Sequence, residues 1–327
     1  MATIKDVAKK ANVSPSTVSR VFSRPELISE KVRRKVIKTA NELNYILDSR
    51  GRNLKLNIKD TCGVIISDSE NPFYLKVIHE MSKLPAYKDK KTFIMFSEEK
   101  SDLEYSSIIS LLSSNVDTVF FTPTDDANPK IEEIFKQNNV SALQLYRNKF
   151  DSLDSLIIDD CYGAYLATKT LIENGHTNII LFDIDISIPT GRPEGYKKAF
   201  KEFGLKVKSS NIVKIRFDQN FEEIIYKAIK DIKPTAIITT GNAMTHIAYK
   251  LFKENDIRVY DDISLIAYDD IDMAKYLGLT VISHPYEEIA SKALEIINER
   301  KENPDKEPIH QTIKPFIILR NSVKKLN

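Results

Sequence analysis

The chain has 327 residues, of which 42% are hydrophobic and 29% are charged, so it is long enough for two or three domains and too apolar for extended disorder. Its two cysteines, Cys62 and Cys161, lie far apart, which excludes a disulfide framework and a cysteine-rich zinc cluster. No stretch reaches the roughly 18 apolar residues of a membrane span, and the charged N-terminal segment lacks the pattern of a signal peptide, so we expect a cytoplasmic protein with no membrane partner.

The distribution of charge divides the chain into two parts. Residues 1–59 contain 8 Lys and 6 Arg against 2 Asp and 3 Glu, a net charge of +9, whereas the whole chain carries +2. The remaining residues therefore carry −7. A basic N-terminal module joined to an acidic remainder indicates binding to a polyanion such as nucleic acid, although a solvated basic face would give the same balance.

The first 45 residues have the pattern of a helix-turn-helix. Thr3 with Asp6 three residues later is typical of a helix start. Ser14 followed by Pro15 predicts a second helix, because a proline at the first helical position loses no hydrogen bond. Ser29 is expected to cap a third amphipathic helix. Three short helices with a tight turn between the first two indicate a DNA-binding domain.

The second predicted helix presents polar side chains opposite its apolar face. At about 100° per residue, Val18 and Val21 cluster on one side and Arg20 points away from them. An outward arginine can donate two hydrogen bonds to the O6 and N7 edge of guanine, and hydroxyl groups suit phosphate oxygens. Alternatively, the serines are only helix caps and Arg20 is a solvated charge. The candidate DNA-binding residues of this segment are Thr3, Ser14, Pro15, Ser16, Thr17, Ser19, Arg20 and Ser29.

From residue 62 onward, short apolar runs alternate with amphipathic segments. This alternation predicts an α/β fold of parallel sheets with helices on both faces. The number of runs predicts two lobes, with a ligand in the cleft outside the strand ends. The predicted strands lie at 63–66, 92–96, 118–121, 142–145, 179–182, 236–238 and 265–267, and two clear helices at 162–173 and 244–254.

Residues 3–8 (TIKDVA) and 13–21 (VSPSTVSRV) resemble the headpiece of the lactose/galactose repressor family, and 13–16 is also similar to maltose-type regulators. The resemblance continues along almost the whole chain, for example at 71–74 (NPFY) and 268–270 (YDD). It implies a two-lobed core like that of periplasmic sugar-binding proteins. It also implies a homodimer or a tetramer that binds a double-stranded DNA operator as a repressor under the control of a small-molecule effector, most often a sugar.

The polar, basic segment 46–60 is typical of a linker. The resemblance implies that this linker forms a hinge helix on DNA, in which Leu54 inserts into the minor groove with Arg52 nearby. Such an insertion unstacks a base step and kinks the duplex. The segment departs from the family pattern at Leu47, Asp48 and Gly51. A glycine weakens a helix by about 1 kcal/mol relative to alanine. Alternatively, Leu54 packs against its own domain.

Polar and aromatic residues follow several predicted strands, at the edge where an open α/β sheet binds ligands. Arginine and aspartate suit vicinal hydroxyl groups or a polar heterocycle, and aromatic rings give flat apolar walls. On these grounds the candidate effector-binding residues are Phe73, Tyr74, Arg147, Arg192 and Asp269, and the resemblance adds Phe217 and Asn242, the latter in place of a more usual aspartate. Alternatively, the aromatic pair belongs to the core, the arginines form surface ion pairs and the aspartate caps a helix.

The predicted organisation is a DNA-binding domain over 1–45, a hinge over 46–60 and a core over 61–327. We expect one lobe to contain about 61–158 with 286–314, and the other about 159–285 with 315–327.

The sequence carries no motif of a common enzyme class. It lacks a phosphate-binding Gly-Lys loop, a nucleophile elbow, a metalloprotease helix and a dinucleotide-binding glycine motif. The histidines share no metal-ligand spacing, and we interpret all of them as structural: His79, His176, His246, His284 and His310. We therefore expect no catalytic residues, no metal and no cofactor. A solute-binding receptor with the same core is the main alternative, which the basic headpiece argues against, and a sugar-phosphate-processing enzyme is a more distant one.

Overall fold

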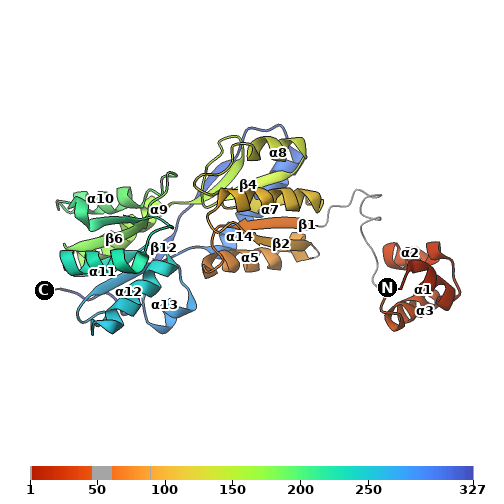
Figure 1. Cartoon of the computed structure of the whole chain (residues 1–327), viewed down its shortest axis with the longest axis horizontal. Coiled ribbons are helices and arrows are strands. Elements are labelled where there is room, and N and C mark those ends of the chain that lie inside the picture. The colour runs from red at the N-terminus through yellow and green to blue at the C-terminus, as the bar shows by residue number, and fades with distance from the viewer. Residues whose placement is uncertain (1, 46–60, 89, 327) are drawn as a thin grey trace. The chain divides into compact units, whose positions relative to one another are not determined.

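The computed structural model describes residues 2–45, 61–88 and 90–326 (Figure 1). The chain divides into two compact units, Met1–Lys59 and Asp60–Asn327. No helix in the described ranges is long and apolar enough to cross a membrane. Within the same ranges, no group of three or more His, Cys, Asp or Glu residues could hold a metal ion.

The N-terminal unit contains the helices α1 (Ile4–Ala11), α2 (Pro15–Ser23) and α3 (Glu30–Glu42), with a short 3₁₀ turn at Pro25–Leu27 between the last two. Successive turns of the three helices contribute the buried core of this unit, which consists of Val7, Ala8, Ala11, Val18, Val21, Val36 and Ala40. Because these side chains are small, the helices pack closely, as a helix-turn-helix requires.

The described residues of the second unit form two six-stranded sheets. The first sheet has the order β11-β5-β4-β3-β1-β2, and its strands are all parallel. The strands are β1 (Thr61–Ile66), β2 (Lys91–Phe96), β3 (Thr118–Phe121), β4 (Ser141–Leu145), β5 (Asp154–Ile158) and β11 (His310–Ile313). Its helices are α5 (Pro72–Lys83), α6 (Pro85–Lys88), α7 (Ser101–Ser113), α8 (Ile131–Gln137) and α14 (Tyr286–Glu302). We call this sheet with its helices the first lobe.

The second sheet has the order β12-β10-β9-β8-β6-β7, with β12 antiparallel to β10 and the other pairs parallel. Its strands are β6 (Ile179–Ile184), β7 (Ile212–Ile215), β8 (Ala236–Thr239), β9 (Ser264–Tyr268), β10 (Thr280–Ser283) and β12 (Phe316–Ile318). Its helices are α9 (Asp160–Glu173), α10 (Arg192–Glu202), α11 (Phe221–Ile232), α12 (Asn242–Glu254) and α13 (Asp272–Tyr276). This is the second lobe.

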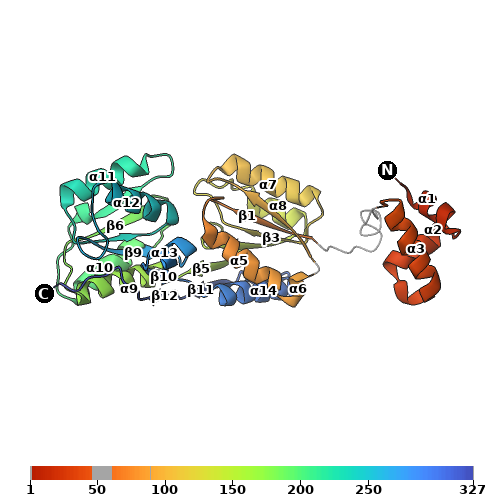
Figure 2. The ribbon, with the colours of Figure 1, turned by 90° about the horizontal axis from the view of Figure 1, so that it is seen from below.

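Helices cover both faces of each sheet, as predicted (Figure 2). In the first lobe α5 and α14 pack on one face and α7 and α8 on the other. In the second lobe α9 and α10 lie opposite α11 and α12. Each of the seven runs found in the sequence is a strand, with ends within two residues of the prediction. Strands buried on both faces read as continuous apolar runs, which accounts for those such as β3 and β8 but not for β2, which is largely exposed.

Within residues 90–326 the chain passes between the lobes after β5, after β10 and after β11. The carboxyl ends of the strands therefore face a shared cleft, because residues that follow β1 and β4 line one cavity together with residues that follow β6 and β9.

Candidate functional site

The exposed face of α2 carries the side chains suited to base contact. Val18 and Val21 are buried, as the helical wheel predicts. The exposed residues are Pro15, Ser16, Ser19 and Arg20. Among the described residues, the guanidinium of Arg20 has no ion-pair or hydrogen-bond partner. All its donors are therefore available to a ligand such as a base edge or a phosphate.

Some of the hydroxyl groups at the helix starts already make hydrogen bonds within their own helix. Thr3 Oγ1 donates to Asp6 Oδ2 at 2.7 Å, and the Thr3 amide donates to the same oxygen at 2.8 Å. These two hydrogen bonds lower the pKa of Asp6. Ser14 Oγ accepts from the Thr17 amide at 3.0 Å, so both residues cap their helices as predicted. Ser29 stands at the N-cap position of α3 but makes no capping side-chain hydrogen bond, which corrects that prediction. Of the hydroxyl groups of Thr3, Ser14 and Ser29, only that of Ser29 is not used in capping and is available to bind phosphate.

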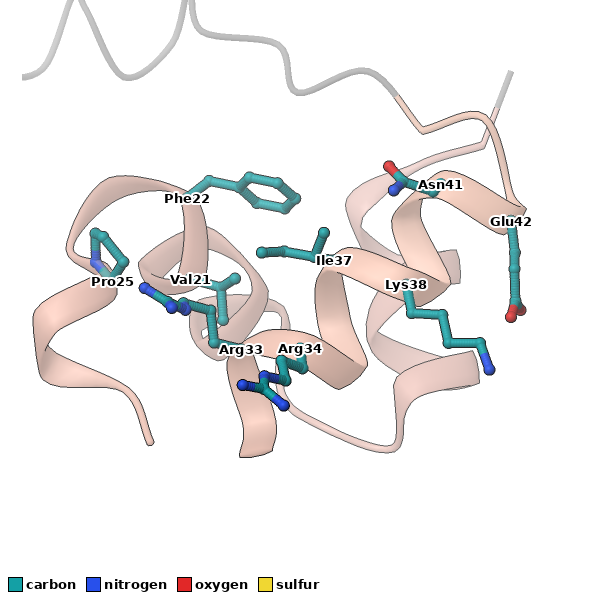
Figure 3. A pocket seen from close by; sticks show the side chains of 9 residues that line it. All are labelled: Val21, Phe22, Pro25, Arg33, Arg34, Ile37, Lys38, Asn41 and Glu42. Carbon is teal, nitrogen blue, oxygen red and sulfur yellow. The ribbon is translucent and has the colours of Figure 1, made fainter. Parts of the chain in front are cut away.

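A hollow of about 700 Å³ lies between α2 and α3 of the same unit (Figure 3). Phe22 and Ile37 point into it, and Pro25 lies at one end. Arg33, Arg34 and Lys38 form its rim. The apolar floor offers few partners to hydroxyl groups, so this hollow does not suit a sugar.

The core unit contains a second cavity, of about 250 Å³, between the two lobes. Its walls bring together five of the predicted effector-binding residues, Phe73, Tyr74, Arg147, Arg192 and Asp269. The first three belong to the first lobe and the last two to the second. The other polar lining residues are Asn71, Tyr146, Asn148, Asp160, Thr190, Thr240, Tyr268 and His284.

The two aromatic residues at the start of α5 serve both the core and the cavity wall. Phe73 is 6% exposed and Tyr74 9%. The Phe73 ring meets those of Tyr146 and His284 edge to face, with centroids 4.8 and 5.0 Å away. The Tyr74 hydroxyl lies 2.8 Å from that of Ser67, and burial raises the pKa of Tyr74 to about 12. Both rings are therefore fixed in place, and the core alternative holds alongside the ligand-facing one.

Arg147 follows β4 and forms a bidentate ion pair with Glu99. Its Nη1 donates to Glu99 Oε2 at 2.8 Å and its Nη2 to Glu99 Oε1 at 2.7 Å. Nη1 also donates to the Pro123 carbonyl at 2.9 Å. These bonds use three of the five N–H groups of the guanidinium. Arg147 lines the cavity, and its pair with Glu99 is not a pair of the outer surface, because the two side chains are only 12% and 9% exposed.

Arg192 begins α10 and binds two carboxylates of the second lobe. Its guanidinium lies 2.9 Å from Asp160 and 3.2 Å from Asp183, and 5.1 Å above the centre of the Tyr268 ring. Burial opposes the charge on Arg192, but the two carboxylates outweigh burial and raise the pKa of the guanidinium. Among the described residues, Arg192 Nε is buried without a hydrogen-bond partner. A buried donor without a partner is costly unless a ligand satisfies it.

Asp269 follows β9 in a left-handed backbone conformation, with φ 71°. Its Oδ1 lies 3.0 Å from His284 Nε2, and its Oδ2 accepts from Asn242 Nδ2 at 3.1 Å. Asn242 also donates to the Asn71 side chain of the first lobe. The N-cap of α13 is Ile271, so the alternative that Asp269 caps a helix is wrong. Asn242 thus positions Asp269 without lining the cavity itself.

Comparison with known proteins assigns both units. Residues 3–48 match the family described as bacterial regulatory proteins, lacI family. Residues 59–317 match the family described as periplasmic binding proteins and sugar binding domain of LacI family. The chain belongs to the LacI family. It is a DNA-binding transcription regulator and not an enzyme.

Curated LacI-family relatives match this chain over all or almost all of its length. The HTH-type transcriptional repressor PurR of Photobacterium profundum is 32% identical over 336 residues, with 100% of both chains covered. The ribose operon repressor of Escherichia coli K12 is 30% identical over 329 residues, covering 98% of this chain and all of the relative. A solved structure of the lac repressor dimer bound to operator shares the fold, with a TM-score of 0.78, 21% identity and 98% of each chain covered.

Three predicted site residues of this LacI-family chain lie outside the described geometry of either site. Phe217 is in the turn after β7, is 44% exposed and does not line the cavity. Arg52 and Leu54 fall in segment 46–60, outside the described residues. Their contacts with effector and DNA stay predictions.

Sequence reasoning missed several residues that shape the cavity. Asp160 lies two residues after the end of β5, and His284 directly follows β10. The strand-end rule would have found both had the short runs at 154–158 and 280–283 been recognised as strands. Asp183 lies within β6 and Glu99 after β2. No local pattern pointed to these two, because each matters through an arginine on a different element.

Proposed function

We propose that the chain represses transcription in the cytoplasm by binding a near-palindromic operator as a homodimer, and that a sugar in the interlobe cavity sets its operator affinity. The observation that carries the effector assignment is the juxtaposition of Arg147 and Arg192 with Asp160 and Asp269 around a cavity of about 250 Å³. Forked donors and paired acceptors at this spacing suit the vicinal hydroxyl groups of a monosaccharide. One relative, the ribose operon repressor, is named for a sugar.

The other relative is PurR, but the cavity favours a sugar over a purine. A purine is a flat aromatic ligand that gains affinity by stacking on an open aromatic face. The Tyr268 ring is covered by the Arg192 guanidinium, and the Phe73 ring is enclosed by Tyr146 and His284. A sugar needs hydrogen-bond partners for its hydroxyl groups. Two residues of the lining, Arg192 and His284, carry buried nitrogens, Nε and Nδ1, that have no partner among the described residues.

The edge of the first sheet supports the homodimer. The outermost strand β2 pairs with β1 alone in the described sheet, and its Phe93, Ile94 and Phe96 are 44%, 40% and 42% exposed. An apolar edge strand of this kind promotes aggregation unless another surface covers it. A second copy related by a two-fold axis would cover it and would present one α2 to each operator half-site. Ile94→Glu is therefore expected to give monomers in sedimentation velocity, and an unchanged dimer would contradict this interface.

Operator recognition is tested through Arg20. Arg20→Ala is expected to lose discrimination at one guanine of each half-site, with a loss of about 1–3 kcal/mol on the specific duplex. Lys31→Ala serves as a control: it removes an exposed charge near the start of α3, and the loss of a charge that only neutralises phosphate affects specific and random duplex alike. An equal loss by Arg20→Ala on both duplexes would make Arg20 a phosphate contact.

For Leu54→Ala we expect less operator bending with random-duplex binding retained.

The effector class is tested by thermal shift with sugars, sugar phosphates and purines, followed by operator-release titration of each hit. A ligand that binds only the folded state raises its melting temperature. A sugar that both stabilises the protein and changes operator affinity supports the proposal. A purine hit without a sugar hit would overturn the effector class, and a sugar that leaves operator affinity unchanged would favour a solute receptor without a regulatory role.

A further inference from the structure

The Arg147–Glu99 ion pair determines how much positive charge the cavity presents. Glu99 takes both terminal nitrogens of the guanidinium, and both side chains are almost buried. Burial opposes the charge on Arg147, and Glu99 more than compensates, so the pKa of the arginine is raised. Arg147 therefore stays charged, but its charge is neutralised before any ligand arrives.

The backbone holds Glu99 in this position. Glu98 and Glu99 form the centre of a turn after β2, and both have positive φ angles, 48° and 52°. Residues other than glycine and asparagine adopt this region rarely. The turn is closed by a hydrogen bond from the Lys100 amide to the Ser97 carbonyl at 2.9 Å and joined to β1 by one from the Glu99 amide to the Ser67 carbonyl at 3.0 Å. The carboxylate is thus presented to Arg147 by a constrained turn rather than by a freely moving side chain.

Carboxylates outnumber guanidinium groups around the cavity. Arg192 is paired with Asp160 and Asp183, and Asp269 adds a further carboxylate on the same side. With Glu99, four carboxylates face two arginines, a formal charge of −2 when the nearby histidine is neutral. Among the described residues that line the cavity, both arginines are paired, so a phosphate group would meet no unpaired guanidinium there. Hydroxyl groups, in contrast, can donate to carboxylate oxygens and accept from the remaining N–H groups.

We propose that Glu99 is a specificity-determining residue, which neutralises Arg147 so that the cavity accepts an uncharged sugar and excludes its phosphate ester. This inference rests on the proposed sugar-responsive function and names the class of sugar. It goes beyond that function, because the carboxylate that selects the ligand is one that lines no wall of the cavity itself.

The test is calorimetric titration of the full-length protein with matched pairs of probes, namely ribose and ribose 5-phosphate, glucose and glucose 6-phosphate, and fructose and fructose 6-phosphate. Wild type is expected to bind a free sugar in preference to its phosphate. Glu99→Gln leaves Arg147 unpaired, so the preference should move toward the phosphate by on the order of tenfold or more, given an effective dielectric constant near 20. Glu98→Gln is the matched control, because it removes the same charge from an exposed position on the same turn.

Folding and the proposed function are checked separately. Glu99→Gln should retain operator binding. If it does not fold, Glu99→Asp, which keeps the charge but shortens the side chain and so weakens the pair with Arg147, should move the preference toward the phosphate by a smaller factor. A wild type that prefers the phosphate ester, or equal selectivity in Glu99→Gln and Glu98→Gln, would overturn the role of Glu99 while leaving sugar control intact. Failure of every sugar and phosphate to bind, with operator binding normal, would instead overturn the proposed effector class and this inference with it.

Discussion

Replacement of Arg192 by alanine is expected to destabilise the core unit in addition to removing a ligand contact. The guanidinium lies 2.9 Å from Asp160 and 3.2 Å from Asp183, and the Asp183 side chain is only 1% exposed. The other side-chain partners described for Asp183 are the hydroxyl groups of Thr190 and Thr240, at 3.0 and 3.1 Å. Arg192→Ala therefore leaves a buried carboxylate with two neutral donors and no cation.

The size of the effect follows from this geometry. Removing one partner of a buried ion pair costs about 3–5 kcal/mol. The two hydroxyl donors and the 17% exposure of the Arg192 side chain place the loss near the lower limit, at about 3 kcal/mol. For a domain of 150–250 residues, melting temperature changes by about 2–4 °C per kcal/mol. The variant should therefore melt about 6–12 °C below wild type.

Thermal unfolding of wild type, Arg192→Ala, Asp183→Asn and the double variant tests this reasoning. The double variant should recover a large part of the loss, because an asparagine carries no charge to neutralise. Lys250→Ala is the control, since its partner Glu222 is 44% exposed and such pairs contribute about 1 kcal/mol at most. A melting temperature of Arg192→Ala equal to that of wild type, or a double variant less stable than Arg192→Ala, would refute the argument.

Three further predictions concern the core unit. Burial raises the pKa of Glu104 from 4.5 to about 7, so the free energy of unfolding should fall by about 3 kcal/mol as pH rises from about 4.5 through 7. Glu104→Gln should lack this fall, which urea unfolding at pH 5 and 8 measures. Gly195→Ala should prevent native packing of α9 against α10, because a Cβ atom would lie 1.9 Å from the Cys161 carbonyl; near-wild-type melting would contradict this. Asp125→Ala removes three hydrogen bonds that residues of the second lobe donate to Asp125 of the first lobe, so sugar affinity should fall by about tenfold. Calorimetric titration measures this affinity, and an unchanged value would contradict the prediction.

Much of the fold could be predicted because its signals are local. The Thr3 and Ser14 caps and Pro15 at a helix start report contacts within one turn of helix. Strands such as β3 and β8 are buried on both faces, so the hydrophobic pattern alone marks them. The strand-end rule then placed Arg147, Arg192 and Asp269 at one cavity, because parallel strands bring their carboxyl ends to the same edge.

The pairings within the site could not be predicted, because they join residues far apart in the chain. Glu99 and Arg147 are separated by 48 positions, and no local pattern relates them. The apolar run at 92–96 was correctly predicted as a strand, yet β2 is exposed along most of its length. Hydrophobicity reports that a surface will be buried, but it does not distinguish burial in the core from burial against a second copy.

The cavity also explains how a small ligand can control a two-lobed protein. Each lobe has its own buried core, whereas the side-chain hydrogen bonds between lobes are a few polar contacts such as Asp125 with Ser187 and Asn71 with Asn242. The angle between the lobes is therefore easier to change than the structure within either one.

A sugar that contacts Arg147 on one side and Arg192 on the other gains its full set of bonds only in the closed arrangement. Moving a population from 1:99 to 99:1 requires a difference of about 5.5 kcal/mol between the two states. Hydrogen bonds to charged groups contribute about 1.5–3 kcal/mol each, so two to four of them that form only on closure are sufficient, and a monosaccharide has enough hydroxyl groups to make them.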